Sequence, residues 1–211
     1  LGTYLLLGQL MGGGMGMPRF EAAVVGNLEL TWLIPLSLIG TVCGWLYFVS
    51  EHASEALAHA IGERPVVKAM LAGLALAICG TVLPYTMFAG ETQADVLMET
   101  YLTIPAGVLI ATGLVKAMLT PALINLGWRG GHFFPVIFSG VSLGYGLAIL
   151  TGADPVFCVA VCTASTMGAV MRQPVMVVGL LLMCFPLKGI VCMIIAAAIA
   201  AGIPLPKPLH K

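Results

Sequence analysis

The segment GWRGGHFFPVIFSG, residues 127–140, holds the residue types and the spacing best suited to a chemical role in this chain. Three glycines lead into two phenylalanines and Pro135, so an open backbone turns abruptly into a helix whose first turn accepts proline. The first turn of a helix leaves about four N–H groups without an intrahelical partner, and the helix dipole places roughly +0.5 charge there. This junction can therefore bind an anion through backbone amides, without any charged side chain.

The composition places this helix start in a membrane. The chain has 211 residues, of which 60% are hydrophobic and 9% are charged, and its mean hydropathy is +1.05. Such values are typical of a membrane-embedded protein rather than a soluble domain. Lipid cannot satisfy bare helix amides, and irregular backbone persists at membrane depth only where it is buried in protein or lines a wet cavity. The alternative interpretation of residues 127–140 is an ordinary glycine turn at a helix break, without a ligand.

The other chemically capable residues do not form a catalytic group. Glu51, Glu55 and His59 fall on one helical face and could ligate a metal, but a solvated helix extension explains the same spacing. The six cysteines lie within apolar runs without a C-x-x-C pair, so we expect them to be small packing residues. No nucleophile accompanies the histidines, no phosphate-binding glycine loop with lysine occurs, and the formal net charge is zero. We therefore expect no enzyme, no cofactor, no metal and no nucleic-acid partner.

The elements that must position the helix start are a series of apolar stretches. Those of about 20 residues are long enough to cross a bilayer, whereas the shorter ones need help from their neighbours. Short or broken segments are typical of transporter and channel cores whose binding sites lie near the midplane. Besides the helix that continues from the glycine turn to Ile149, the stretches comprise residues 4–17, 31–50, 66–89, 102–124, 157–171, 175–185 and 189–203.

The charges between these stretches predict the topology. Basic residues place the charged segment 51–68 in the cytoplasm, because cytoplasmic loops are enriched in lysine and arginine. The acidic segment 91–99, which we expect to be a loop, and Asp154 then face outward. The chain returns to the cytoplasm at Arg172, which we interpret as a topology anchor rather than a ligand.

Three motifs resemble those of one known family, the CLC chloride channels and chloride/proton exchangers. GGHFFP, residues 130–135, is similar to the G-x-F-x-P signature that starts an anion-binding helix in that family. GAVMRQP at 168–174 resembles its small-residue, R-x-P turn between two later helices, and PKPLH at 206–210 resembles the segment that begins its last helix. The likeness runs from about residue 31 to the C-terminus and is strongest over residues 127–174.

The resemblance implies the fold. We expect an all-α polytopic membrane protein of about eight membrane helices, several tilted or broken, that forms one half of a CLC-like inverted-repeat architecture. Residues 1–30 would be the remnant of a membrane helix plus a loop, and residues 31–211 the second-half transmembrane domain. The family's GSGIP-like segment and its G-[KR]-E-G-P segment, which carries the gating glutamate, do not occur in these residues. We therefore expect the chain to be a fragment, and its sequence does not distinguish a channel from an exchanger.

The resemblance also implies the function and the site residues. We expect transport of an anion, chloride, as a channel or a chloride/proton antiporter in the inner membrane of a bacterium. The N–H groups of His132 and Phe133 would contact the anion, with Gly130 and Gly131 supplying the open turn. An aliphatic residue is usual in place of His132, whose side chain we expect to face a wet vestibule. His210 would stand where a tyrosine commonly donates its hydroxyl group to the ion.

The implied partners are the lipid bilayer, a small anion and a second copy of the chain, because residues 175–185 and 189–203 match part of the family's dimer surface. If the backbone binds the anion, Gly131→Val should weaken the free energy of anion binding by on the order of 2 kcal/mol, because a distorted turn misaims the amides. His132→Ile should change anion binding little. Two alternatives remain open. One is a secondary transporter for organic anions from another inverted-repeat class, and the other is a membrane scaffold subunit that transports nothing.

Overall fold

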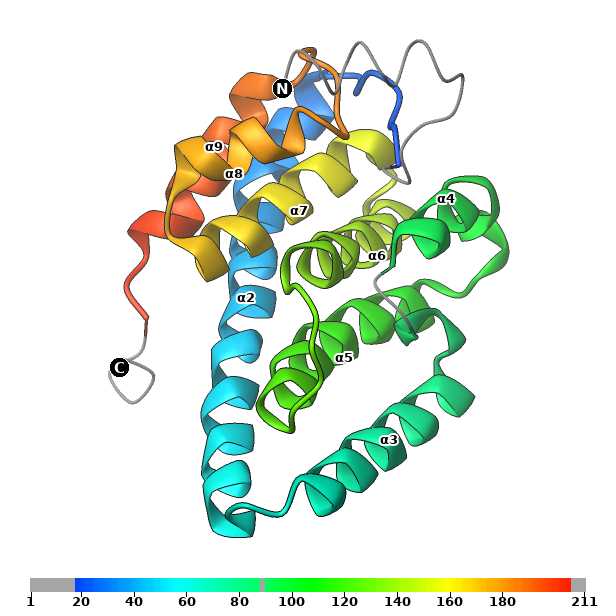
Figure 1. Cartoon of the computed structure of the whole chain (residues 1–211). Coiled ribbons are helices and arrows are strands. Elements are labelled where there is room, and N and C mark those ends of the chain that lie inside the picture. The colour runs from blue at the N-terminus through cyan, green and yellow to red at the C-terminus, as the bar shows by residue number, and fades with distance from the viewer. Residues whose placement is uncertain (1–17, 88–89, 206–211) are drawn as a thin grey trace, which may run out of the picture.

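The computed structural model describes residues 18–87 and 90–205 of the chain. Within these residues the protein consists of α-helices, two short 3₁₀ helices and connecting turns, without a β-strand, so the all-α prediction is confirmed (Figure 1). The expected apolar stretch 4–17 lies outside the described residues. The elements are α2 (Asn27–Ile61), α3 (Pro65–Val82), η1 (Pro84–Thr86), α4 (Glu91–Thr100), η2 (Tyr101–Thr103), α5 (Ala106–Asn125), α6 (Phe133–Thr151), α7 (Pro155–Met171), α8 (Pro174–Leu181) and α9 (Ile190–Gly202).

The lengths of these helices fit a multi-pass membrane protein. Of the helices in the described ranges, α2, α3, α5 and α6 are long and apolar enough to cross a membrane. The apolar helices α7 and α9 have 17 and 13 residues, and α8 has only 8. A crossing takes about 20 residues, with a range of about 17–25, so α7 is at the lower limit and α8 and α9 are too short to span a bilayer alone. The expected mixture of full and incomplete helices is therefore present.

The charged segment 51–68 is divided between two helices. α2 continues through the first part of the segment as far as Ile61, which confirms the helical extension that the sequence predicted. Gly62 then ends α2 with a φ of 68°, a conformation that glycine adopts without steric cost. Pro65 opens α3, because proline is well suited to the first helical position. The segment therefore extends α2 as far as Ile61 and then turns the chain into α3.

The expectation that residues 91–99 form a loop is wrong, because they lie in α4. Ala94 and Leu97, three positions apart, share one helical face and are both buried. This face packs against α6. Burial of two apolar side chains on a neighbouring helix thus stabilises a short helix whose polar composition alone suggests a loop. Gly90 precedes it with a φ of 105° and lies so close to Phe138 of α6 that a side chain there would collide with the ring.

α7 is the central helix and packs against α2, α6 and α9 (Figure 1). α2 meets it through Gly40 and Gly44, and α6 meets it through Gly140 and Gly144. A Cβ at any of these four glycines would collide with α7 atoms, so the helix backbones are in direct contact. Each pair has the G-x-x-x-G spacing that lets membrane helices approach closely, a signal that was readable in the sequence.

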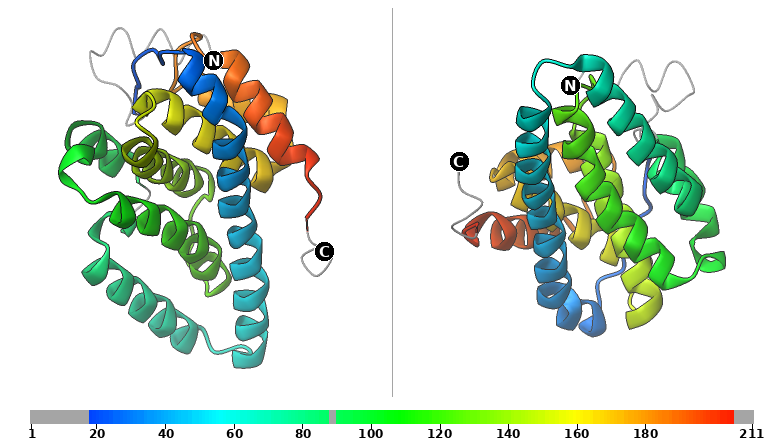
Figure 2. Two further views of the ribbon diagram at one scale, coloured as in Figure 1. Left: turned by 180° about the vertical axis from the view of Figure 1, so that it is seen from behind. Right: turned by 90° about the horizontal axis from the view of Figure 1, so that it is seen from below.

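α3 differs from the other long helices in its packing. It lies at the edge of the molecule in both views of Figure 2. Only Ala72 of this helix is buried, and apolar side chains such as Met70 and Val82 are about 70% exposed, at 69% and 72%. In a membrane protein such a face is suited to lipid contact.

Side-chain hydrogen bonds join neighbouring helices inside this packing. The Thr166 hydroxyl donates to the Gly40 carbonyl oxygen over 3.2 Å and links α7 to α2. The Ser142 hydroxyl donates to the Leu109 carbonyl oxygen over 2.8 Å and links α6 to α5. Such bonds between membrane helices typically contribute about 0.6 kcal/mol each, so close backbone packing is the larger determinant of the arrangement.

The α6–α7 contact predicts a strong effect of one substitution. Gly144→Ile places a branched side chain against the backbone of Val159, and we expect it to destabilise the fold by ~3 kcal/mol or more, because backbone atoms cannot move aside as a side chain can. The measurement is the thermal unfolding midpoint of the purified full-length protein in detergent. Gly107→Ala is the matched control, since nothing lies within 4 Å of a Cβ there and α5 should tolerate it. Equal unfolding midpoints for the two variants would contradict the packing described here.

Candidate functional site

The loop between α5 and α6 begins with a complete helix C-cap. Gly127 has a φ of 98° and donates its N–H to the Ile124 carbonyl oxygen over 3.0 Å. The N–H of Trp128 donates to the Leu123 carbonyl oxygen over 3.0 Å. This pair of bonds is the Schellman arrangement, which satisfies the last carbonyl groups of α5 and requires the left-handed conformation that glycine supplies. Gly127, the first glycine of the motif, therefore ends α5 and is not part of the start of α6.

Gly130 and Gly131 do not have the role that the sequence suggested. Neither has a φ in the left-handed range, and a Cβ at either position would meet no heavy atom within 4 Å in the described chain. The premise of the Gly131→Val prediction, that a positive φ or a close turn excludes a side chain at Gly131, is therefore wrong. The local need for glycine lies at Gly127.

α6 begins with a row of amides that make no hydrogen bond. His132 is the N-cap, with a φ of −90°, and its carbonyl oxygen accepts the N–H of Val136 over 3.2 Å. The N–H groups of His132, Phe133 and Phe134 donate no hydrogen bond to any other described residue. Pro135 has no N–H. Three consecutive donors, on residues that are half-buried, thus point out of the start of α6.

The side chain of His132 lies against a neighbouring ring. Its imidazole stacks on Phe133 with ring centroids 4.5 Å apart and an interplanar angle of 24°. The first turn of α6 contains no acidic residue. The positive end of the helix is therefore not neutralised by its own side chains.

Two other helix starts contrast with that of α6. At α2 the Glu29 carboxylate accepts the N–H of Gly26 over 2.9 Å. At α7 the Asp154 carboxylate accepts the N–H of Phe157 over 2.8 Å. These two helices carry an anionic group at the end where the dipole favours one. The start of α6 offers the same electrostatics to a ligand instead.

The position of this start in the fold is unusual for a helix terminus. After α5 ends, the chain returns toward the middle of the molecule, and α6 starts about halfway along the length of α2 (Figure 1). Membrane proteins place irregular backbone at such depth only where protein or water surrounds it. The start of the helix at this level of the bundle is what the sequence predicted, and its depth in the membrane stays a prediction.

Arg172, expected to be a topology anchor, also has a structural partner. Its φ is 58°, and Nη1 donates a hydrogen bond to the Ile203 carbonyl oxygen over 2.6 Å. The guanidinium therefore caps the C-terminal end of α9, where a positive charge is favoured. His210, the other expected site residue, lies outside the described residues. Glu51, Glu55 and His59 do not form a metal site, because no described group of three His, Cys, Asp or Glu residues is arranged to hold one.

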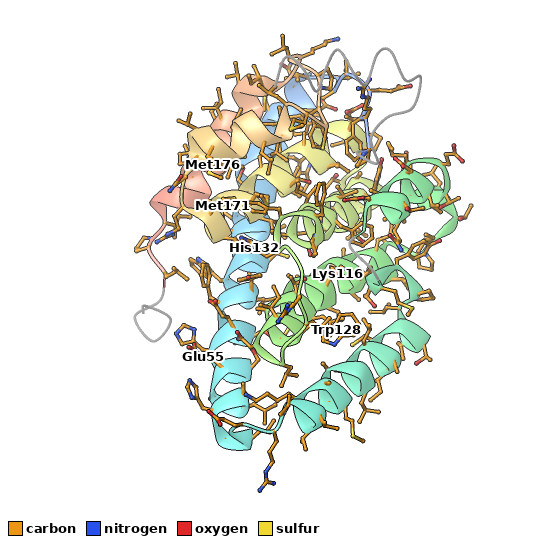
Figure 3. All side chains as sticks on the ribbon, viewed as in Figure 1. Glu55, Lys116, Trp128, His132, Met171 and Met176 are labelled. Carbon is orange, nitrogen blue, oxygen red and sulfur yellow. The ribbon has the colours of Figure 1, made fainter. Side chains whose placement is uncertain are left out.

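The structure brings a buried cation next to the same loop. Lys116 of α5 is 4% exposed, and it lines one cavity together with Gly130 and Gly131 (Figure 3). The sequence alone could have indicated Lys116 as a candidate functional residue, since a lysine in the middle of an apolar stretch is rare unless it has a partner or a function.

The fold and the helix start together define a class of protein. A bundle that combines full-length and incomplete apolar helices, with one helix starting in its interior, is the architecture of channels and secondary transporters. The sequence profile described as "Voltage gated chloride channel" matches residues 5–204. The chain therefore belongs to the voltage-gated chloride channel family.

A solved structure has the same fold. It is titled "Crystal structure of a CLC-type fluoride/proton antiporter" and is 21% identical, with a TM-score of 0.75. The similarity covers 96% of this chain and 52% of that one, so the chain spans about half the length of that protein. A comparison with curated proteins gives no match.

The loop geometry predicts which glycine tolerates a side chain. Gly127→Val forces a β-branched residue into a left-handed conformation and should destabilise the fold by about 1–2 kcal/mol. Gly131→Val should change stability by less than about 0.5 kcal/mol, because its position is open. Thermal unfolding of the two variants side by side measures this difference. If Gly131→Val were less stable than Gly127→Val, the left-handed conformation would not lie at Gly127.

Proposed function

We propose that this chain forms part of an anion transport pathway and that the N–H groups at the start of α6 hold the anion. The observation that carries the proposal is the row of donors on His132, Phe133 and Phe134, which bond to no other group in the described chain. The family assignment supports anion transport as the general activity. Gly130 and Gly131 would leave the approach to these amides open, because they bear no side chain.

The proposed substrate is chloride, carried by a channel or by a chloride/proton antiporter. Fluoride is the natural competitor to test, because the solved structure with the same fold is titled a fluoride/proton antiporter. An amide site suits either halide, since backbone N–H groups donate to an anion without regard to its size. Competition between labelled chloride and unlabelled fluoride in the binding assay below would rank the two ions.

The energetics require more than this one helix. A half charge about 4 Å from an anion contributes about 2 kcal/mol at an effective dielectric of ~20. Transfer of an ion from water to a protein interior costs several kcal/mol even after relaxation. We therefore propose that several donors converge on the anion, with His210 among them.

A pair of variants at one position tests binding by the backbone. His132→Pro removes an N–H group. The φ of −90° at this position is a modest step from the φ of about −65° that proline requires, and Gly131 before it has no Cβ to clash with the ring. We expect the affinity for chloride to fall about tenfold or more, since a hydrogen bond to a charged group contributes ~1.5–3 kcal/mol. His132→Ile keeps the N–H group, so binding and flux should persist.

Calorimetric chloride binding and radiolabelled chloride uptake by the full-length protein in liposomes provide the measurements. Thermal unfolding of both variants checks that each is folded. If His132→Ile abolishes binding while His132→Pro leaves it intact, the imidazole holds the anion and the proposed role of the amides is incorrect.

We further propose that the protein assembles as a homodimer through α8 and α9. The outward faces of these helices are apolar and uncharged, with Val175 87% exposed and Val191 63% exposed. Ile194 and Ile195 continue the same kind of surface along α9 at 46% and 40% exposure. Faces of this composition can be buried against a second helix pair as well as against lipid.

The dimer proposal predicts that two substitutions, each of which introduces a tryptophan on an exposed apolar face, differ in their effect on the oligomeric state. Ile194→Trp should disrupt the interface and shift the protein toward the monomer, because a larger side chain prevents close helix contact. Met70→Trp on the outer face of α3 should leave the dimer unchanged. Crosslinking in detergent and liposomes, with light scattering for mass, distinguishes the states. Only monomers of the parent protein at all concentrations would contradict the proposal.

A further inference from the structure

Arg172, which ends α7, has an unusual backbone conformation. Its φ of 58° is the one positive φ of a residue other than glycine in the described ranges. Its N–H donates to the Gly168 carbonyl oxygen over 3.0 Å and closes the end of the helix. Such a left-handed position usually holds glycine, because a β-carbon there is crowded against the backbone. Residues in strained conformations cluster at functional sites, so the arginine side chain is a candidate for a functional role.

The guanidinium of Arg172 supplies a charge that the neighbouring helix ends lack. Its Nη1 donates a hydrogen bond to the carbonyl oxygen of Ile203, the C-cap of α9, over 2.6 Å. Neither α7 nor α9 has a basic residue in its last turn. The C-terminal end of each helix bears roughly −0.5 charge from the helix dipole. Arg172 therefore sets one positive charge against two negative helix ends.

The charge of Arg172 is not taken up by a carboxylate on the nearby helices. α7, α8 and α9 contain no aspartate or glutamate. Lys188 is the other cation between residues 155 and 203, and it lies in the turn before α9, at the opposite end of that helix. At the C-terminal ends of α7 and α9, Arg172 is thus the cation that these segments supply.

The end of α7 lies level with the start of α6. The glycine contacts between these helices show that they run antiparallel, because residues further along α6 meet residues further back along α7. These contacts are Gly140 with Thr163 and Gly144 with Val159. Continued back by about two turns of α6, the same register places His132 level with Met171. The two residues are close together in the view of Figure 3.

α9 ends at the same level. Gly168 lies so close to the backbone of Ala197 that a side chain there would collide with it, and further along both helices Arg172 reaches Ile203. The two helices therefore run parallel, and their C-terminal ends lie together. Two negative helix ends and the positive start of α6 thus share one level of the bundle.

We propose that Arg172 sets the affinity of the anion site by neutralising the ends of α7 and α9. The inference rests on the proposed function, since it concerns the anion that the amides of His132 and Phe133 hold. Without the guanidinium, the two negative helix ends would outweigh the one positive start at this level and repel an anion. Arg172 does not have to touch the ion, because a charge acts over the distance between neighbouring helices. It determines affinity without being a ligand.

Two substitutions separate the charge of Arg172 from its hydrogen bond. Arg172→Gln keeps an N–H donor but removes the charge, whereas Arg172→Lys keeps the charge. Packed helices lie about 8–10 Å apart, and a unit charge at that distance changes anion affinity roughly tenfold at an effective dielectric of ~20. We expect Arg172→Gln to weaken chloride binding about fivefold or more, and Arg172→Lys to bind like the parent protein. Calorimetric titration of the full-length protein in detergent measures both affinities.

Two further variants serve as controls. Lys188→Gln removes an exposed charge at the opposite end of α9 and should leave chloride binding unchanged. Arg172→Gly relieves the left-handed strain, so its thermal unfolding midpoint should be no lower than that of Arg172→Gln, although its chloride affinity should be equally low. If Arg172 served only to form the turn or to anchor the topology, glycine would replace it without loss of chloride affinity.

The outcomes distinguish this inference from the proposed function. Unchanged chloride binding in Arg172→Gln and Arg172→Gly overturns the role of Arg172, and a loss of binding in His132→Pro would then leave the amide site standing. An equal loss in Arg172→Gln and Arg172→Lys also overturns it, because the charge would not be what the site requires. A loss in Arg172→Gln alone, with His132→Pro intact, supports the effect of the charge and refutes the proposed role of the amides.

Discussion

Backbone N–H and C=O groups cannot remain unpaired in a lipid environment, and several helix ends in the described part of the chain show how this constraint is met. Gly127 and Trp128 close the end of α5 by the Schellman arrangement. Asp154 closes the start of α7, and Arg172 caps the end of α9. At the start of α6 the N–H groups of His132, Phe133 and Phe134 bond to no described residue, and these residues are half-buried. Under the function proposed above, an anion completes this helix start.

The same helix is also held very firmly. Gly140 and Gly144 bring its backbone directly against α7, and α7 is packed in turn against α2 and α9. A donor row at the end of such a helix has little freedom to move. Binding sites built on rigid elements hold their geometry better than sites on loops. The close packing of α6 against α7 at these glycines therefore fixes the orientation of the N–H groups at the start of α6.

The sequence predicted much of this architecture. Apolar length located the spanning helices, and the glycine, phenylalanine and proline pattern located a helix start where α6 begins. The errors were local. α4 was expected to be a loop because its composition is polar, although burial of Ala94 and Leu97 on α6 stabilises it as a helix. Gly131 was assigned a left-handed turn that belongs to Gly127, because three nearby glycines look alike before their φ angles are known.

The sequence by itself determined the membrane class, the helix order and the position of the bare helix start, because hydrophobic length and the special backbones of glycine and proline act locally. Only the tertiary structure decided which ends find partners across the fold. Arg172 reaches Ile203, and Lys116 reaches Thr86, through contacts between segments thirty residues or so apart. Such pairings depend on how the helices pack, and no local pattern encodes them. The cavity beside the start of α6 exists for the same reason, since it is formed by three separate segments meeting in space.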